Sequence, residues 1–339
     1  MKNTATKPFF SVLILYWNSA EYLPENLHAL NEQTFKDFEV ILLDNGADEP
    51  PDPAVLSQHT HLEIHLLRSE TNLGFAGGNN LAAQEARGDY IVLLNGDAFP
   101  EPNWLTVLHQ AAQHYPDHCF ASRLLKANHP EILDGEWNVY HASGLAWRKN
   151  HNRPTSLSST RARHVVSACA AAAAYPRDAF EQAGGFDEDF FAYMEDVDLD
   201  LRLRLAGYPC VYLPGAVVRH VGSGSTGSHS DFSTFHGQRN LVWAFVKNMP
   251  GLLFWLLLPA QLLVNLLYLL VGLVMPNREA IWSAKKAAFN GLPGMWSKRR
   301  KVQATRKISV WSFSRLLNWN PLSPLTKLFA RKPSAQKEN

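Results

Sequence analysis

The chain contains few cysteine residues, and they are widely spaced. Among its 339 residues there are three cysteines, Cys119, Cys169 and Cys210, and no Cys-x-x-Cys pair. Disulfide-rich scaffolds and cysteine-based zinc sites need closely spaced or paired cysteines. The cysteine content therefore argues against both kinds of protein and suits a reducing compartment.

Two common glycine-rich phosphate-binding motifs are also missing. Residues 72–80 read Asn-Leu-Gly-Phe-Ala-Gly-Gly-Asn-Asn, which matches neither the P-loop nor the Gly-x-Gly-x-x-Gly fingerprint of dinucleotide-binding proteins. This weakens an ATPase or dehydrogenase interpretation. The glycines still allow backbone N–H groups to approach a ligand closely, and a helix that starts after them would favour an anion.

The N-terminus imitates a signal peptide without its cleavage site. Lys2 and Lys7 precede the apolar run 9–17, but no small-residue cleavage site follows it. We interpret the run as a buried first strand and expect no signal peptide.

Net charge is close to zero, yet its distribution along the chain is uneven. The total of +1 comes from 32 basic and 31 acidic residues. Residues 285–339 contain 13 of the basic residues and a single acid, Glu338, so that this tail carries +12. Such asymmetry indicates a polyanionic surface or partner for the tail.

A hydrophobic content of 46% excludes a disordered chain, and the first hundred residues alternate strand and helix patterns. Apolar runs predict strands at residues 11–16, 39–43, 62–67 and 90–94. Periodic segments predict helices at residues 20–33 and 76–87. Strands separated by helices form a parallel sheet, whose ligands bind beyond the carboxyl ends of the strands. Each predicted strand is followed by polar residues there: Asn18, Asp44, Asn72, and Asn95 with Asp97.

Residues 120–165 are less regular, and we interpret them as a variable insertion. Order returns with a helix near 177–183, an acidic cluster that opens another helix at Glu195, and strands at 210–213 and 216–220. No internal repeat is evident.

Two strand-end carboxylates suggest chemistry, each beside a simpler alternative. Asp97 could share a divalent cation with a diphosphate, or it could be a solvated turn residue. Asp44 could accept hydrogen bonds from a nucleotide base or ribose, or it could cap an Asx-turn. His220 ends a predicted strand and is either a structural histidine or a metal ligand beside Asp97.

The densest signal is the cluster of Glu195, Asp196 and Asp198 in the first turn of a predicted helix. Acids there complement the helix dipole, so capping is one interpretation. Neighbouring residues point in different directions, so one acid could cap while the other faces a cleft as a general base. Asp200 and Arg204 are expected to form a structural i,i+4 pair.

Taken in order, these segments resemble the inverting family 2 glycosyltransferases, particularly the bacterial rhamnosyltransferase-like branch. The resemblance covers about residues 8–248 and rests on the following segments: 11–18, 43–46, 72–80, 94–97, 184–204, 208–220 and 238–240. It implies an α/β protein with a GT-A fold, in which a Rossmann-like nucleotide-binding half is continuous with an acceptor half. We expect the glycosyltransferase domain at 1–248, with its nucleotide half at about 8–118 and its acceptor half at about 119–248.

The resemblance also implies residue roles. Asp196 would be the catalytic base, with Glu195 beside it; Asp44 would contact the base of the donor, and Asp97 and His220 would hold Mg²⁺ or Mn²⁺. The nucleotide-sugar site is predicted to contain Asn18, Asp44, Asn72, Gly74, Asn79, Asn80, Asn95 and Asp97. Asn95 replaces the first acid of the family's Asp-x-Asp motif, so this motif supplies one carboxylate to a metal instead of two.

The implied reaction is inverting transfer of a sugar from a nucleotide diphosphate to a hydroxyl of a lipid-linked or cell-surface glycan. dTDP-L-rhamnose is the favoured donor. The alternatives are a UDP-hexose or galactofuranose donor, or a nonenzymatic subunit that resembles a glycosyltransferase. No recognition motif for nucleic acid accompanies the basic tail, so nucleic acid is not an expected partner.

Residues 251–275 carry no charge and are long enough to cross a membrane. A single crossing would separate the enzyme half from the basic tail, although nucleotide sugars and the positive-inside rule place both in the cytosol. Because Pro259, Gln261 and Asn265 interrupt the run, we expect a re-entrant or interfacial helical pair rather than a true span or a buried or oligomer-forming pair.

The expected organisation is therefore a membrane-associated segment at 249–278 and a basic helical tail at 279–339 that lies on anionic lipid. The expected location is the cytoplasmic face of the bacterial inner membrane.

Overall fold

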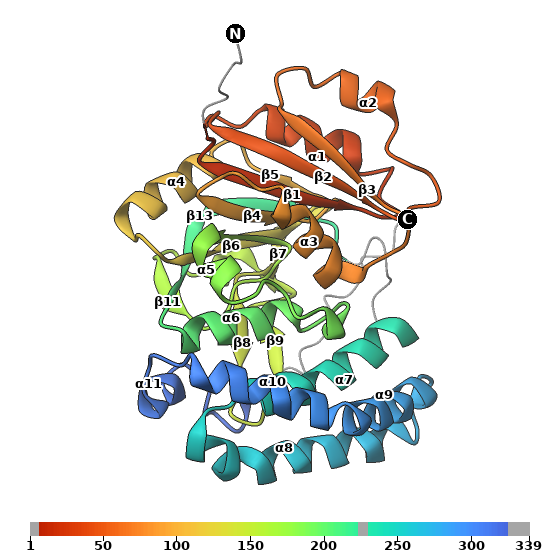
Figure 1. Cartoon of the computed structure of the whole chain (residues 1–339), viewed down its shortest axis with the longest axis vertical. Helices are drawn as coiled ribbons and strands as arrows, with labels where there is room; N and C mark the ends of the chain where they lie inside the picture. Colours follow the sequence, from red (N-terminus) through yellow and green to blue (C-terminus); the bar gives the residue numbers. More distant parts are fainter. Residues whose placement is uncertain (1–6, 223–229, 325–339) are drawn as a thin grey trace.

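The computed structural model describes residues 7–222 and 230–324, and Figure 1 shows a central sheet flanked by helices with a layer of C-terminal helices at one end. This confirms the expected α/β class. Residues 325–339 of the predicted basic tail lie outside the described residues.

The first half of the sheet is parallel, as predicted. Strands β1 (Phe10–Tyr16), β2 (Phe38–Asn45), β3 (Ile64–Ser69) and β4 (Tyr90–Leu94) lie in the order β4-β1-β2-β3. The helices of this half are α1 (Leu23–Asn31), α2 (Pro53–Ser57), α3 (Gly74–Gln84) and α4 (Trp104–His114). β2 and β4 are buried along their whole length, because helices cover both faces of the sheet.

The second half extends the sheet with mostly antiparallel strands, and eleven strands form one sheet in the described part of the chain. β12 (Ala172–Pro176) pairs with β4 and with β6 (Cys119–Lys126), and β6 pairs in turn with β7 (His129–Gly135). The interpretation of 120–165 as an irregular insertion is therefore wrong for its first part, since β6 is a buried strand inside the sheet. The first four residues of β6 are all buried, so the strand shows no alternation of polar and apolar residues that would mark it in the sequence.

One long strand, β13 (Cys210–His220), replaces the two strands predicted there. The pairing register of β13 with β6 shifts between Leu213 and Val217, and this irregularity accounts for the two separate strands predicted from the sequence. β13 pairs with β6, with β5 (Ala98–Pro100) and with β11 (Arg163–Val165). The remaining strands are β10 (Arg153–Pro154), at the sheet edge, and β8 (Asn138–Tyr140) with β9 (Ala146–Arg148), which form a separate hairpin.

Hydrophobic cores lie on both sides of the sheet. One packs α1 and α4 through Leu27 and Leu108, and the other packs α3 and α6 through Ala82 and Leu199. Helix α6 spans Glu195–Leu205; the short helices of this region are η1 (Thr155–Leu157), α5 (Arg177–Gln182) and η2 (Glu188–Phe190).

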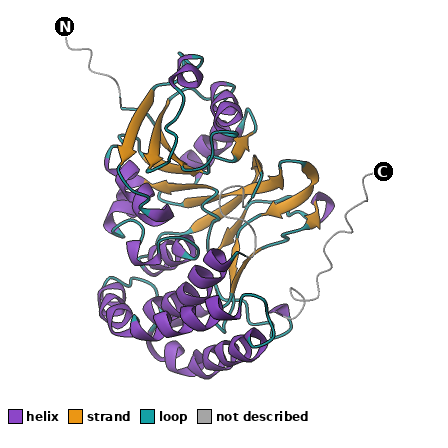
Figure 2. Ribbon diagram, turned by 90° about the vertical axis from the view of Figure 1, so that its right-hand side faces the viewer, coloured by secondary structure: helices purple, strands orange, loops and turns teal. Residues whose placement is uncertain are grey.

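The C-terminal helices form a layer under α6, seen from a second side in Figure 2. They are α7 (Asp231–Asn248), α8 (Gly251–Gly272), α9 (Arg278–Asn290), α10 (Leu292–Ala304) and α11 (Val310–Ser314). The expectation that Pro259 breaks the apolar run is wrong: α8 is one helix with Pro259 inside it. Among the described residues, α8 is the one helix long and apolar enough to cross a membrane, by length and composition.

Candidate active site

The carboxyl ends of β1, β2 and β4 meet at one edge of the sheet, which we call the sheet mouth. Tyr16 at the end of β1 is in register with Asp44 on β2. Asn26 of α1 donates hydrogen bonds to the carbonyls of Asn95 and Ala98, at 3.0 and 2.7 Å, and so fixes the turn after β4. Asn18 is exposed just beyond β1, with a φ of 50°.

Asp44 is buried at the end of β2, and its two carboxylate oxygens have different partners. Oδ1 accepts a hydrogen bond from the Ala47 N–H at 3.0 Å, so Asp44 caps the turn that follows it, one residue further along than an Asx-turn does. Oδ2 lies 3.4 Å from Nε of Arg68, its register partner on β3. Oδ2 has no hydrogen bond within the described residues and is itself buried, so its contact with a nucleotide stays a prediction.

The glycine-rich segment 72–80 is held by protein contacts. Asn72 Oδ1 accepts from the Gly74 N–H at 2.8 Å. Gly74 has a φ of 71°, and a Cβ there would lie 2.6 Å from the carbonyl oxygen of Phe191. Glycine is therefore required at 74 for close packing against the chain at 191, and its contact with a donor stays a prediction.

The other two asparagines of this segment, Asn79 and Asn80, also make internal hydrogen bonds. Asn79 Nδ2 donates to the Phe75 carbonyl one turn earlier at 2.9 Å. Asn80 binds both the N–H and the carbonyl of Phe186, at 2.8 and 2.9 Å, and donates to Glu188. Asn80 thus joins α3 to the segment that precedes α6. Donor contacts by either side chain remain predictions.

Asp97 and His220 come together, although 123 positions separate them in the chain. The pairing of β5 with β13 places His220 opposite Ala98, and His220 Nε2 then lies 3.2 Å from Asp97 Oδ1. Asn95 Nδ2 lies 3.3 Å from the same imidazole nitrogen. The predicted metal-binding residues therefore converge on one point, where a carboxylate oxygen of the kind that Mn²⁺ and Mg²⁺ prefer meets an imidazole nitrogen.

Asp134, at the end of β7, completes this corner, and sequence reasoning missed it. Its Oδ2 lies 2.7 Å from His220 Nδ1, and it also pairs with Arg148 of β9. Burial opposes the charge, but Arg148 and the hydrogen bonds from His151 and His220 hold the pKa of Asp134 well below its usual range. An Asp134 that accepts from Nδ1–H leaves Nε2 facing Asp97.

His220 itself is buried, and burial alone would lower its pKa. The hydrogen bonds from the imidazole to Asp134 and Asp97 outweigh burial and raise the pKa of His220 to about 9. For Asp134, the only signal in the sequence is its position directly after the apolar pair Ile132-Leu133. Asp134 meets His220 only because β6 pairs with both β7 and β13.

Asp196 lies at the start of α6 and faces the hairpin β8–β9. Its Oδ2 accepts hydrogen bonds from Asn138 Nδ2 at 3.0 Å and from the Ala170 N–H at 3.3 Å. Burial raises the pKa of Asp196, and these hydrogen bonds and the charge of Arg148 oppose the rise. Arg148 therefore interacts electrostatically with Asp196 while it pairs with Asp134.

Glu195 differs from its neighbour in environment. It is 6% exposed, and its Oε2 has no hydrogen bond within the described residues. Burial and the charge of Asp196 raise the pKa of Glu195 well above its usual value, which favours its protonated form. The role of Asp196 as the catalytic base stays a prediction.

The backbone before Glu195 and Asp196 is strained, and side chains of α7 hold it in place. Phe191, Tyr193 and Met194 have φ angles of 62°, 66° and 69°, which non-glycine residues rarely adopt. Asn240 of α7 donates to the carbonyls of residues 190, 192 and 193, at 2.8, 2.9 and 2.7 Å. Arg239 binds the carbonyls of residues 189 and 190. The structure thus gives segment 238–240 a role in holding the turn that presents Asp196.

The rest of the acidic cluster is structural, in a different pairing from the one expected. Asp200 does not pair with Arg204 in the described structure; its Oδ2 accepts from the Ala168 N–H at 2.6 Å. The i,i+4 pair of α6 is Asp198 with Arg202, at 2.9 Å. These two residues face α7, whereas Asp200 faces the backbone that follows β11.

Lysines of the C-terminal layer complete this buried network. Lys247 of α7 lies 2.6 Å from Asp187 and 2.8 Å from Asp198, and all three side chains are almost fully buried. Lys298 of α10 pairs with Asp187 and Asp189 from the outside. The C-terminal layer is therefore tied by charge to the segment that carries Asp196.

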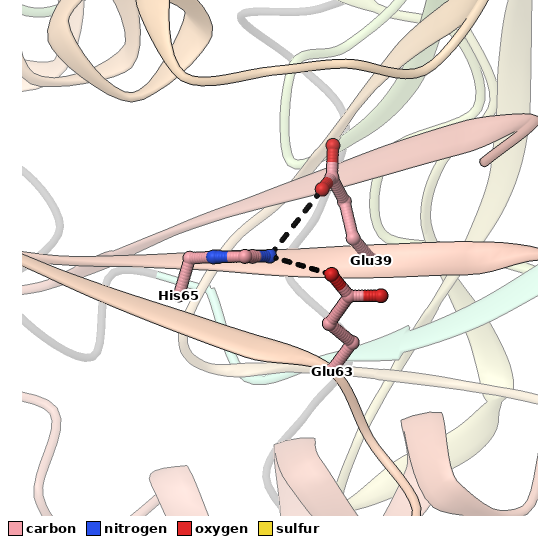
Figure 3. A group of neighbouring side chains, drawn as sticks. All are labelled: Glu39, Glu63 and His65. Carbon is pink, nitrogen blue, oxygen red and sulfur yellow. Dashed lines mark hydrogen bonds and ion pairs between the residues drawn. The ribbon is translucent and has the colours of Figure 1, made fainter. Parts of the chain in front are cut away.

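A second acidic group lies at the opposite ends of the strands. Glu39, Glu63 and His65 point toward one another, with His65 Nε2 3.5 Å and 3.0 Å from the two carboxylates (Figure 3). Arg87 already serves this cluster, since its Nε donates to Glu39 at 2.7 Å and its guanidinium also pairs with Glu63. We interpret the group as a salt-bridge network.

Comparison with known proteins identifies the family. The family model for glycosyl transferase family 2 matches residues 11–184, more than half of the chain. The chain belongs to glycosyltransferase family 2. A curated relative, the N-acetylglucosaminyl-diphospho-decaprenol L-rhamnosyltransferase of Mycobacterium tuberculosis, is 29% identical over 246 residues, which cover 64% of this chain and 77% of that protein.

Solved structures confirm the GT-A fold of this glycosyltransferase. GalNAc-T7 with UDP, GalNAc and Mn²⁺ superposes with a TM-score of 0.57 at 18% identity, over 72% of this chain and 48% of that chain. The mannosyltransferase PcManGT of Pyrobaculum calidifontis, with GDP-Man and Mn²⁺, gives a TM-score of 0.53 at 16% identity, over 89% and 86% of the two chains. At these identities the likeness concerns the fold alone.

Proposed function

We propose that this glycosyltransferase transfers a sugar, with inversion, from a nucleotide diphosphate to a hydroxyl of a lipid-linked saccharide. One observation carries the proposal: a chain of interactions runs from Asp97 through His220, Asp134 and Arg148 to Asp196. The predicted diphosphate corner and the predicted base are thereby held in one charged framework.

A divalent cation fits the corner formed by Asp97 and His220. A carboxylate oxygen and an imidazole nitrogen face one another there, with Asp134 bound to the other ring nitrogen. When bound, Mn²⁺ or Mg²⁺ would neutralise the charge of the departing diphosphate. Structures with Mn²⁺ among the neighbours support this assignment.

The chemistry at the acceptor needs one base. As the acceptor oxygen bonds to the anomeric carbon, its proton passes to Asp196 and the bond from carbon to the diphosphate oxygen breaks. Asn138 and the Ala170 N–H orient the Asp196 carboxylate. Burial and the charge of Asp196 favour the neutral form of Glu195, so we assign the role of base to Asp196.

dTDP-L-rhamnose is the donor we propose, since the curated relative is named a rhamnosyltransferase. UDP-hexose and galactofuranose donors are the alternatives, because Asp44 Oδ2 and Arg68 suit any pyrimidine nucleotide. The acceptor we propose is a polyprenyl-diphosphate-linked saccharide, by analogy with the name of the same relative. Such an acceptor and a cytosolic donor place the enzyme on the cytoplasmic face of a bacterial inner membrane.

A donor panel tests the proposal. The full chain is incubated with a polyprenyl-diphosphate-linked N-acetylglucosamine acceptor and each donor, and release of nucleotide diphosphate is measured with and without EDTA. We expect release from dTDP-L-rhamnose, dependent on acceptor and absent in Asp196→Asn. Turnover with a UDP-hexose instead would show that the donor is not dTDP-L-rhamnose. Turnover retained in EDTA would show that the reaction does not need a divalent cation.

A further inference from the structure

Helix α8 presents an apolar side outward over its entire length. Its exposed positions recur every three or four residues, and eight of them are large hydrophobic residues that are 50–82% exposed. We call this side the outer face of α8; it consists of Leu252, Trp255, Leu256, Pro259, Leu262, Leu263, Leu266, Leu267 and Leu270.

The polar residues of α8 lie on its inner side. Gln261 is 3% exposed, and Asn265 Oδ1 accepts a hydrogen bond from Lys285 of α9 at 2.6 Å. A helix on the surface of a water-soluble domain has the opposite arrangement, with polar side chains outward. The few polar residues of α8 thus face the protein while its outward side is apolar, which indicates an apolar environment on the outside.

The inner side is also firmly packed, which excludes a simple crossing of the membrane in this conformation. Phe254 and Leu257 are buried in one core with Phe245 of α7 and Phe313 of α11. A crossing helix would lose these contacts and place Gln261 within hydrocarbon. Figure 1 shows α8 as the outermost helix at the lower edge, running across the long axis of the molecule.

The apolar surface continues beyond α8. Leu273 and Val274, just after the helix, are 55% and 86% exposed. Trp282 and Phe289, two turns apart on α9, are 50% and 73% exposed. Tryptophan is enriched where protein meets the headgroup region of a bilayer.

Positive charge accompanies this surface. Arg278, Lys286, Arg300 and Lys301 are exposed, and residues 285–324 contain no acid. The charge available to lipid is smaller than the +12 of the whole tail, because Lys298 and other cations are used inside the protein. The remaining cations suit the phosphates of an anionic leaflet.

An apolar hollow of about 480 Å³ lies between α7, α8 and α10. Its walls suit an acyl chain, and its single guanidinium suits a lipid phosphate. The residues that line it include Val246, Phe254, Leu258, Leu292, Trp296 and Arg300.

We propose that the outer face of α8 is a monotopic docking surface for an anionic phospholipid bilayer, in which α8 lies parallel to the membrane plane. Docking does not depend on the proposed reaction. Its purpose, access to an acceptor anchored in the membrane, rests on the proposed function.

Vesicle binding tests the docking surface. Full-length protein is sedimented with vesicles of phosphatidylglycerol and of phosphatidylcholine, as wild type and as the double variant Leu256→Glu, Leu263→Glu. We expect wild type to prefer phosphatidylglycerol and the double variant to lose binding by about tenfold or more, because two carboxylates would enter the interface. The matched control is Leu157→Glu. Leu157 is 58% exposed in η1, so this variant should bind vesicles as wild type does.

Depth-dependent quenching of wild-type tryptophan fluorescence makes the test independent of any variant that fails to fold. Lipids brominated near the headgroup should quench more strongly than lipids brominated near the chain ends. Stronger quenching from the chain ends would mean a crossing helix and overturn the proposal. Wild-type binding by the double variant would overturn it as well.

Two further measurements distinguish bilayer docking from self-association and from the sugar-transfer reaction. A wild-type dimer in solution that the double variant converts to monomer, without vesicle binding by either, would show that a second copy covers the face and would overturn the proposal. Turnover with a water-soluble acceptor should be unchanged in the double variant. Loss of vesicle binding with turnover retained supports docking alone, whereas vesicle binding by a wild type that turns over no donor would contradict the reaction and leave docking intact.

Discussion

At the sheet mouth charged side chains are buried against one another, whereas on the outer face of α8 leucines are exposed. Asp134 and His220 are 3% and 5% exposed, while Leu252 and Leu256 are 82% and 70% exposed. Both arrangements cost free energy in water. A folded chain retains them where a ligand or a surface supplies favourable contacts, so each region indicates its own kind of partner.

The largest effect on activity is expected from Asp196→Asn. Because the amide cannot accept the proton, kcat should fall by about 10²–10⁴-fold, with the melting temperature nearly unchanged. Steady-state release of nucleotide diphosphate and a thermal melt measure the two. A drop of less than tenfold would mean that another group is the base.

The pH profile of wild type gives an independent reading of the same residue. Burial raises the pKa of Asp196, and a general base must be ionised, so kcat/KM should fall as the pH is lowered through that raised pKa. Asp196→Asn should lack this limb of the profile.

Lys247→Met probes the junction between the two regions. Removing the ammonium leaves Asp187 and Asp198 buried without their shared partner. Breaking a buried pair in this way costs about 3–5 kcal/mol, which urea denaturation would measure as a lower midpoint. An unchanged midpoint would show that the helical layer and α6 are held by apolar packing alone.

Asp134→Ala should weaken metal binding, although Asp134 is not itself one of the predicted metal ligands. His220 would lose the acceptor that orients its ring, and Mn²⁺ affinity should fall by about 10–100-fold. Titration of Mn²⁺ followed by electron paramagnetic resonance measures the affinity directly. Asp134→Asn keeps an acceptor for Nδ1–H and should restore part of it; equal losses in both variants would point to the charge rather than the hydrogen bond.

The smallest effect is expected for Lys298→Met. Lys298 pairs with Asp187 and Asp189, but its side chain is one-third exposed, so water screens the pair. The change should cost about 1 kcal/mol or less in urea denaturation. A cost equal to that of Lys247→Met would remove the distinction between the buried and exposed sides of the junction.

The parallel half of the fold was predictable because its strands are continuous apolar runs separated by helices. Asp44, Asn95 and Asp97 could be placed at one edge for the same reason, since parallel strands end together. Strand β6 could not be recognised, because its burial depends on β12 and β13, which lie far away in the chain. Asp134 was missed with it.

The roles of individual residues were harder to predict than their positions. The sequence marks Gly74 as special, but only the structure shows that Phe191 occupies the space next to it. The sequence likewise groups Glu195 with Asp196, whereas the structure gives only Asp196 the side-chain hydrogen bond from Asn138 and the charge of Arg148, which oppose the rise of its pKa on burial.

The sequence by itself determined the α/β class, the family, the strand-end carboxylates and the presence of a long apolar segment, because each is written in local periodicity or in a short motif. The tertiary structure alone decided which distant groups meet. It joined Asp134 to His220 and turned the polar residues of α8 inward. Contacts between segments far apart depend on strand pairing and helix packing, which local sequence does not specify.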